Sequence, residues 1–297
     1  MNILVLSAAL AAVSTGVCAQ TPSDSLDGGV RHIGGEEVTA RRIDRTVRSA
    51  RPVQTVGGDE LERAGIYTLS DAVKRFAGAN VRDYGGIGGM KTVSVRNLGA
   101  GHTAVSYDGV TVSNTQAGQI DLSRFTTDNV QNVTLTLGED DDVMQPARHR
   151  ASAAVLSITG RKPVFADGRD WSLRTRVRSG SWGLLSPQLR YWQRLGDRLT
   201  LSLDGTYMRA DGRYPYELPN GAERLTDKRH NTDIYSWQGE ANLYALLPRG
   251  SRLDVKAQWF SSSRGLPGAV ILYNTKKSHE RMWDEEFFVQ SVYGQDI

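Results

Sequence analysis

The chain has 297 residues, of which 36 are lysine or arginine and 33 are aspartate or glutamate, so its formal net charge is +3. This balance argues against a dedicated nucleic-acid-binding protein, which usually carries a clear basic excess on one face. The only cysteine is Cys18, in a segment that we expect to be removed. A mature chain without a thiol excludes a disulfide framework and a cysteine-ligated zinc site.

Residues 1–19 are predicted to be a secretory signal peptide. Ile3 to Val17 is a short apolar run, and it is too short to cross a bilayer as a helix, which takes about 20 apolar residues. Small residues follow the run, so we expect cleavage after Ala19. A lipid attached at Cys18 is the alternative, although Val17 is a poor match to lipoprotein signals.

The distribution of aromatic residues divides the rest of the chain. All six tryptophans and eight of the eleven tyrosines follow Asp170, so we place a domain boundary between Pro163 and Asp170. Residues 20–50 are polar and highly charged, and they are predicted to form a flexible arm. Residues 51–162 are predicted to form one domain, and residues 171–297 a second region rich in strands.

The first domain is predicted to be of the α+β class. A strand is expected over Pro52 to Val56, and a short helix over Asp59 to Ala64, where acidic residues suit the helix N-terminus. A second helix is expected over Ser70 to Ala77, with Ser70 as its N-cap. Further strands are expected at four places: around Val93 and Val95, around Val105 and Tyr107, over Asn132 to Leu137, and over Ala154 to Thr159.

After Asp170 apolar and polar residues alternate with a period of two, which predicts about six strands. The clearest segments are 171–178, 199–207, 237–245 and 253–259, and the sixth strand is expected at Phe287 to Tyr293. Both a transmembrane barrel with a polar lumen and a soluble sheet with one wet face give this pattern. Tight turns at Leu195 to Arg198 and at Pro248 to Gly250 alternate with long polar loops at 211–232 and 262–284, which favours the barrel.

Several short motifs follow one another in a fixed order in the first domain. They are Pro52-Val-Gln-Thr-Val56, Leu69-Ser-Asp-Ala-Val73, Gly78-Ala-Asn-Val81, Val95-Arg-Asn-Leu98 and Tyr107-Asp-Gly-Val110. The ordered set resembles the plug domain of TonB-dependent outer-membrane receptors, with Ala77 where proline is usual and Asn97 where glycine is usual. Segments 119–124, 145–148 and 264–269 are also similar to Bacteroidetes-type receptors.

The resemblance implies a receptor in the cell outer membrane, with the plug inside a barrel of about 22 strands. Such a barrel takes about 220 residues at about 10 per strand, and only 127 residues follow Asp170. The expected fold is therefore an α+β plug domain followed by an incomplete antiparallel transmembrane β-barrel. We therefore expect this chain to be the N-terminal fragment of such a receptor.

The resemblance also implies a partner, the TonB protein of the inner-membrane energising complex. The segment Glu36, Glu37, Val38, Thr39 and Ala40 is similar to a TonB box. Such a peptide adds a strand to the edge of its partner's sheet, and main-chain hydrogen bonds supply the affinity. An ordinary linker, or the first strand of the plug, is the alternative.

The implied function is import of a scarce small-molecule solute, such as cobalamin or a ferric siderophore. Solute contacts are expected in apical plug loops, at Tyr84, Gly85, Gly86, Ile87, Gly88, Gly89 and Met90, and at Asn114 and Gln116. The inward-facing Arg174, Arg176 and Arg178 are expected to pair with plug acids. A secreted soluble β-rich binding module is the alternative function, and a non-functional truncated receptor is another.

Other chemistry is not supported by the sequence, so we predict no enzyme, no cofactor and no metal site. The glycine-rich run before Lys91 is not a phosphate loop, because Met90 stands where that loop needs glycine. The five histidines are scattered, without the spacing of a metal motif. Four consecutive acids, Glu139 to Asp142, lack the spacing of a calcium loop and are expected to be solvated.

Overall fold

The computed structural model describes residues 52–295, except for residues 88, 115–117, 139–144, 167, 222 and 271–277. All of the described residues belong to one compact unit, Asp44–Ile297. The expected signal peptide, flexible arm, TonB box and acidic loop lie outside the described residues. Within the described part of the chain, no helix is long and apolar enough to cross a membrane.

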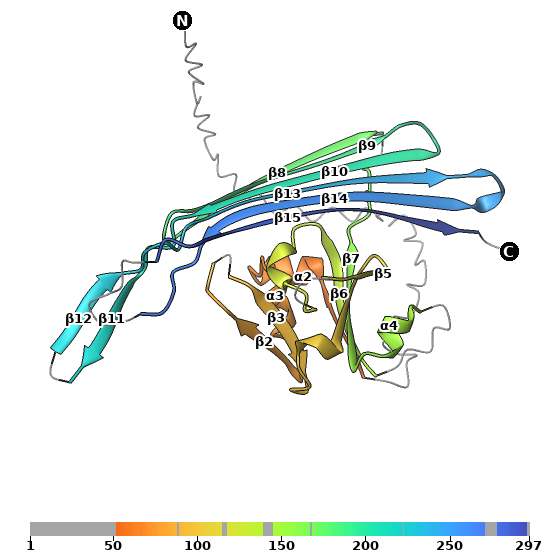
Figure 1. Ribbon diagram of the computed structural model, residues 1–297. Helices are drawn as coiled ribbons and strands as arrows, with labels where there is room; N and C mark the ends of the chain where they lie inside the picture. The colour runs from red at the N-terminus through yellow and green to blue at the C-terminus, as the bar shows by residue number, and fades with distance from the viewer. Residues whose placement is uncertain are drawn as a thin grey trace, which may run out of the picture. The chain divides into compact units, whose positions relative to one another are not determined.

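The N-terminal domain is built on a five-stranded sheet with the order β1-β6-β7-β4-β5 (Figure 1). These strands are β1 (Val53–Gly57), β4 (Thr103–Tyr107), β5 (Val110–Val112), β6 (Val130–Leu137) and β7 (Ala154–Gly160). Strands β4 and β7 are parallel, and the other neighbours are antiparallel. A separate hairpin joins β2 (Ala79–Asp83) to β3 (Lys91–Val95). The strands predicted from the sequence are confirmed, and β2 and β5 are additional.

The domain also contains short helices, of which α2 packs on β1 and β6. They are α2 (Gly58–Arg63), α3 (Leu69–Val73) and α4 (Ala147–Arg150), with 3-10 turns η1 (Ala100–His102) and η2 (Leu122–Arg124). The predicted N-cap of the second helix was wrong. Thr68 is the cap, because its backbone is extended and its hydroxyl accepts a hydrogen bond from the Asp71 amide, whereas Ser70 lies in the first turn. The helix is also shorter than predicted, since the Ala77 amide donates to the Gln54 side chain instead.

Apolar side chains from both layers form the core of this domain. Leu61 of α2 and Leu69 of α3 are completely buried, and so are Val133, Leu135 and Leu156 of the sheet. Val133 and Leu135 lie two positions apart on β6, so they point to the same face. Burying each such side chain stabilises the fold by about 1.5–3 kcal/mol.

The C-terminal region forms an antiparallel sheet of six strands in the described residues, with the order β15-β14-β13-β10-β9-β8. Its strands are β8 (Trp171–Gly180), β9 (Leu184–Arg194), β10 (Leu199–Ala210), β13 (Ile234–Leu246), β14 (Arg252–Gly265) and β15 (Arg281–Gly294), with η3 (Pro248–Gly250) in one turn. The sheet is not closed, since β8 and β15 are its edges. The predicted class, an α+β domain followed by an incomplete antiparallel barrel of about six strands, is confirmed.

The long connections differ from the prediction. The expected loop at 211–232 contains a hairpin of β11 (Pro215–Asn220) and β12 (Glu223–Lys228). The expected loop at 262–284 is shorter, because Ser262 pairs with Asp284 and Ser263 with Trp283 in the β14–β15 ladder. Backbone hydrogen bonds hold this ladder, and they do not depend on apolar side chains. The prediction from polar composition therefore made this loop too long.

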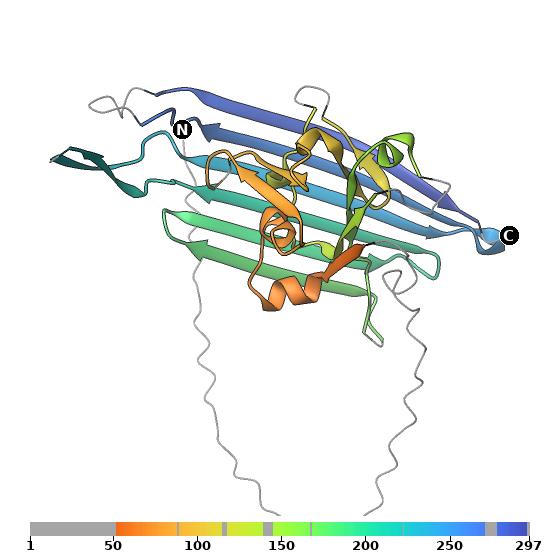
Figure 2. The same ribbon diagram turned by 90° about the horizontal axis from the view of Figure 1, so that it is seen from below.

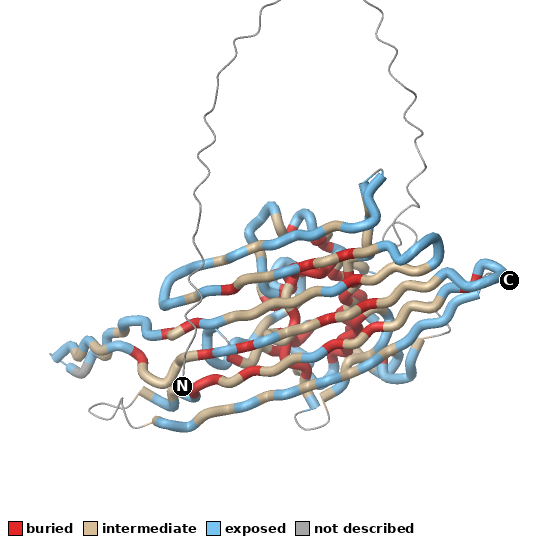
Figure 3. Tube along the Cα trace, turned by 90° about the horizontal axis from the view of Figure 1, so that it is seen from above, coloured by how far each residue is buried: buried red, intermediate tan, exposed pale blue. Residues whose placement is uncertain are grey.

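The two faces of the six-stranded sheet differ in polarity and in exposure. Apart from Gly265, every buried residue of β9, β10, β13 and β14 has an even number, and the registers pair even with even positions. Figure 3 shows buried positions in red, separated by less buried ones along the strands. Large apolar side chains at odd positions are exposed on the other face: Trp171, Leu173, Val177, Leu185, Leu189, Leu203, Trp237, Trp259, Trp283, Phe287 and Val289. A soluble sheet shows the opposite arrangement, with its apolar face covered.

The covered, polar face of the sheet contacts the N-terminal domain (Figure 2). An apolar exposed face and a polar inner face are the arrangement of a barrel wall in lipid. The alternation of residues therefore corresponds to a transmembrane wall, with the N-terminal domain on its inner side.

Candidate functional site at the inner face of the sheet

Glu240, on the inner face of β13, is the most densely contacted acid of this junction. It is only 6% exposed. Its carboxylate accepts from the Tyr107 hydroxyl at 2.6 Å, from the side-chain amides of Asn129 and Asn242 at 2.8 Å, and from the Lys256 ammonium at 2.9 Å. Burial, together with the Glu240 charge, raises the pKa of Tyr107 well above 10.0, so this hydroxyl stays protonated and donates.

Lys256, on β14, joins the sheet to a tight turn of the N-terminal domain. Its ammonium lies 2.6 Å from a carboxylate oxygen of Asp108 and 3.7 Å from the ring centre of Tyr107. The turn is left-handed at both Asp108 (φ 47°) and Gly109 (φ 85°), a conformation that Asp-Gly pairs favour in hairpins. The Asp108 carboxylate also accepts from the Gly160 amide at 2.6 Å, which fixes its direction.

Three arginines at alternate positions of β8 contact two acids of the N-terminal domain. Arg178 binds Asp128 through two nitrogens at 2.7 and 2.5 Å, and Arg176 donates to the same carboxylate at 3.1 Å. Arg174 and Arg176 both form ion pairs with Glu62 of α2. The expectation that these inward-facing arginines pair with acids of the first domain is confirmed.

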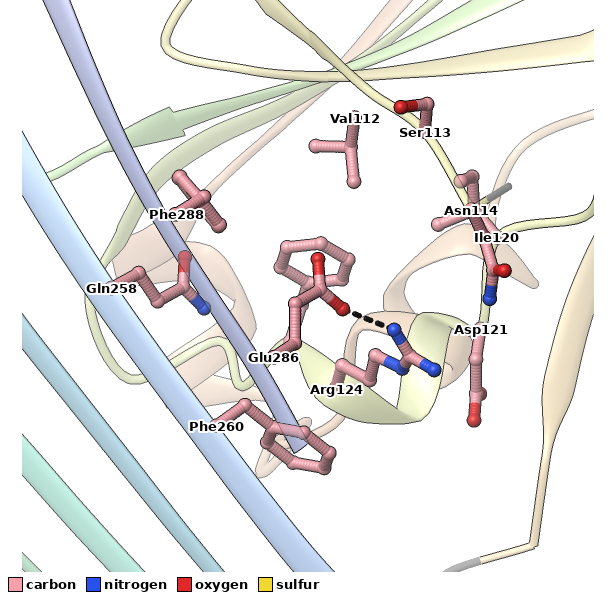
Figure 4. A pocket seen from close by; sticks show the side chains of 11 residues that line it. Val112, Ser113, Asn114, Ile120, Asp121, Arg124, Gln258, Phe260, Glu286 and Phe288 are labelled. Atoms are coloured by element: carbon pink, nitrogen blue, oxygen red, sulfur yellow. Dashed lines mark hydrogen bonds and ion pairs between the residues drawn. The ribbon is translucent and has the colours of Figure 1, made fainter. Parts of the chain in front are cut away.

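A further contact joins the short turn η2 to β15. Arg124 forms an ion pair with Glu286 and lies 3.9 Å from Asp284, which also lies 3.6 Å from Arg264 of β14. A cavity of about 10 Å³ lies beside Arg124, room for about one water molecule. Figure 4 shows its lining: Val112, Ser113, Asn114, Ile120, Asp121, Arg124, Phe125, Gln258, Phe260, Glu286 and Phe288.

Residues 45–142 match the family described as the TonB-dependent receptor plug domain. This part of the chain is a TonB-dependent receptor plug domain. We therefore call residues 52–162 the plug and the six-stranded sheet the barrel wall. Members of this family are outer-membrane transport receptors and not enzymes, so the predicted location and the prediction of no enzyme are confirmed. The Bacteroidetes type stays a prediction.

Solved structures of this family share the fold at low sequence identity. A copper transporter, OprC, is 14% identical with a TM-score of 0.55, and the match covers 73% of this chain and 32% of OprC. The ferric enterobactin receptor PfeA of Pseudomonas aeruginosa is 16% identical with a TM-score of 0.53, covering 83% of this chain and 39% of PfeA. The iron transporter FrpB of Neisseria meningitidis is 11% identical with a TM-score of 0.56, covering 71% and 32%. The chain thus spans about a third of the length of these structures.

The predicted apical loops of the plug lie side by side. The Tyr84 amide donates to the Met90 carbonyl at 2.9 Å and closes the first loop. The Lys91 amide donates to the Asp121 carboxylate at 2.9 Å, which joins this loop to the segment that contains Asn114. Tyr84 is 58% exposed. The solute contacts predicted for Tyr84, Gly85, Gly86, Ile87, Gly89, Met90 and Asn114 stay predictions, and Gly88 and Gln116 lie outside the described residues.

The position of these loops relative to the wall follows from two contacts. Arg124, next to the second loop, binds Glu286 near the start of β15, which follows a long loop. Lys162, at the other end of the plug, binds Asp254 near the tight turn between β13 and β14 at 2.9 Å. The apical loops therefore lie toward the long loops of the wall.

Sequence reasoning identified the Asp108-Gly109 turn but not its ion pair, and it did not single out Glu240 or Lys256. The sequence did contain a signal for Glu240 and Lys256. Both are charged residues on the polar side of alternating strands, like the arginines of β8, which were predicted to pair with acids of the plug. Within the described residues, no group of three or more His, Cys, Asp or Glu side chains is arranged to hold a metal ion.

Proposed function

We propose that this chain acts in TonB-dependent import of a scarce solute through the outer membrane. The observation that carries the proposal is the inverted polarity of the wall. Its apolar face is exposed, and its charged face is covered by a plug that contacts it through ion pairs. A plug held by polar contacts is able to move, because water solvates the separated groups, whereas a close-packed apolar interface loses its burial.

The proposed sequence of events begins at the apical loops. A solute binds outside to the loop of Tyr84 to Met90 and to the segment of Asn114, both of which face the long loops of the wall. The TonB protein then adds the segment Glu36 to Ala40 to the edge of its own sheet and pulls. The pull reaches β1 first, because β1 is the first described strand and lies at an edge of the plug sheet.

For the solute we propose a metal chelate or cobalamin. OprC, PfeA and FrpB are named for copper, ferric enterobactin and iron respectively. Such chelates carry polar groups at their surface, and the exposed Tyr84 of the Tyr84 to Met90 loop offers a hydroxyl to them. This assignment is tested by growth of receptor-dependent cells on a panel of chelates.

The TonB contact is tested with a peptide of residues 30–45 and the periplasmic domain of a TonB protein. We expect binding in fluorescence anisotropy, and we expect Val38→Pro to abolish it, because proline cannot donate a main-chain hydrogen bond. Val38→Thr keeps the amide and is the matched control. Equal binding of both variants, or no binding of the natural peptide, would contradict the proposal.

The rival function, a soluble secreted module, is tested by extraction. A wall with an apolar outer face is expected to stay in the membrane fraction and to need detergent for solubility. Recovery of the folded protein in buffer alone would favour the soluble module.

A further inference from the structure

The guanidinium groups of Arg174, Arg176 and Arg178 form a row on the inner face of β8. Residues two positions apart on a strand are about 6.6–6.8 Å apart along it, so neighbouring groups are able to contact one anion together. The row has three positive charges. In the described residues, the carboxylates it contacts are those of Glu62 and Asp128, both in the plug.

This arrangement differs from that of two other wall cations that face the plug, Lys256 and Arg190. Lys256 has Glu240 as a partner on the wall, and Arg190 has Asp204 at 2.8 Å. Those cations keep a wall carboxylate when the plug moves. Arg174 and Arg176 do not, since their contacts with carboxylates in the described part of the chain are all with the plug.

Glu62 is the acid of this row that a pull at the N-terminus displaces first. It lies on α2, which follows β1 directly, whereas Asp128 lies between η2 and β6. Asp128 is also held more firmly, since its side chain is 1% exposed and its main-chain carbonyl accepts from Arg190. Movement of α2 alone therefore leaves Arg174 without an acid and Arg176 with one.

We propose that Arg174 and Arg176 form an oxyanion-binding site of the barrel wall, occupied by Glu62 at rest and by an anionic solute during passage. This proposal rests on the proposed import function and narrows its solute to an anionic metal chelate. Arginine suits the role, because its planar fork binds two oxygens of a carboxylate or a phosphate at once. Arg174 is half-exposed, so an incoming anion is able to reach it.

The experiment measures binding of citrate to the purified receptor in detergent by calorimetry at low salt. Citrate is a suitable probe because it has three carboxylates. We expect Glu62→Gln to bind citrate about tenfold more tightly than the wild type, because one charge-assisted contact no longer competes. Glu60→Gln is the matched control, since Glu60 lies on the same helix but pairs with Arg75 of the plug. We expect no gain for this control.

A triple variant, Glu62→Gln with Arg174→Gln and Arg176→Gln, decides whether the row is the site. We expect it to lose the gained affinity completely. An equal gain in the Glu60→Gln control, or citrate binding that persists in the triple variant, would overturn the proposal. Because Glu62 is partly exposed and its replacement is isosteric, we expect the variant to fold.

Uptake separates this proposal from the proposed function. We expect Arg174→Gln with Arg176→Gln to slow import of the solute while binding at the cell surface and binding of the TonB peptide stay unchanged. Failure of the natural peptide to bind TonB would count against the import function and leave the citrate result intact. Normal uptake by the double variant would count against the site alone.

Discussion

The arginine row of β8 and the ion pairs of β13 and β14 hold the plug in different ways. On β13 and β14, Lys256 and Glu240 are partners within the wall, and Asp108 of the plug is a third member. On β8, the carboxylates that the described arginines contact come from the plug. Removing the only partner of a buried charge is costly. The plug is therefore able to leave the buried Lys256–Glu240 pair of β13 and β14 without stranding either charge, whereas leaving β8 requires a replacement anion.

The largest effect is expected when the wall pair itself is broken. Lys256→Met leaves the carboxylates of Glu240 and Asp108 facing each other without a cation, and we expect a loss of about 3–5 kcal/mol in the free energy of plug docking. The measurement is the urea concentration at which trypsin cleaves half of the plug. Lys162→Met is the control, because its pair with Asp254 is largely exposed and contributes about 0–1 kcal/mol. Equal shifts for both variants would show that the buried contacts of Lys256 hold the plug no more strongly than the exposed pair of Lys162.

The next effect is expected at the buried end of the arginine row. Arg178→Gln removes both charged contacts of one guanidinium with Asp128, whose side chain is 1% exposed. We expect a loss of about 1.5–3 kcal/mol in the same assay. Arg194→Gln is the matched control, since its partner Asp170 is 71% exposed. If Arg178→Gln caused no loss in this assay, the row would not hold the plug.

Alkaline pH is expected to weaken the β13 side and not the arginines. Burial and the Glu240 charge raise the pKa of Tyr107 above 10.0 in the docked plug. Below pH 10 the hydroxyl is protonated in both states, so it causes no pH dependence. Above pH 10 it ionises only in the unfolded plug, so stability is lost as pH rises, by at most about 1.4 kcal/mol per pH unit.

Tyr107→Phe isolates this contribution, since it removes the ionising group and keeps the ring. We expect a smaller loss of stability between pH 9 and pH 11 in this variant than in the wild type, measured as the urea midpoint at each pH. Parallel pH profiles for the two proteins would contradict the prediction. The guanidinium groups of β8 keep their charge over this range.

The smallest effect is expected at the exposed end of the row. Arg174 is 48% exposed, so Arg174→Gln should cost about 0–1 kcal/mol in docking. We expect the difference to vanish at 1 M salt, where the Debye length falls to about 3 Å. A loss that survives high salt would show that Arg174 holds the plug by more than an exposed ion pair.

Much of the fold is predictable from local pattern. The alternation in β8, β10, β13 and β14, the Asp108-Gly109 turn and the ordered plug motifs all depend on neighbouring residues. Strand β9 has a weaker pattern, because Pro187 lies on its outer face and Trp192 on its buried face. The hairpin of β11 and β12 had a signal that was not used, since Asn220-Gly221 is a typical hairpin turn.

The candidate site is less predictable, because its partners are distant in the sequence. Tyr107 and Glu240 are separated by 133 positions, and Arg178 and Asp128 by 50. Sequence alternation places Glu240 and Arg178 on the inner face, but it does not say which plug residue meets them. That choice depends on how the plug sits against the wall, which no short motif encodes.

The matched registers of the wall limit how the lengths of its strands are able to change. Even positions pair with even positions from β8 to β15. Deleting one residue between Trp237 and Glu240 would turn the side chains on one side of the deletion to the wrong face of the wall, because side chains alternate with a period of two. Deleting two residues would keep both faces. Among homologues of this chain, the lengths of corresponding strands should therefore differ by two residues or a multiple of two. The loops between the strands should differ by any number of residues.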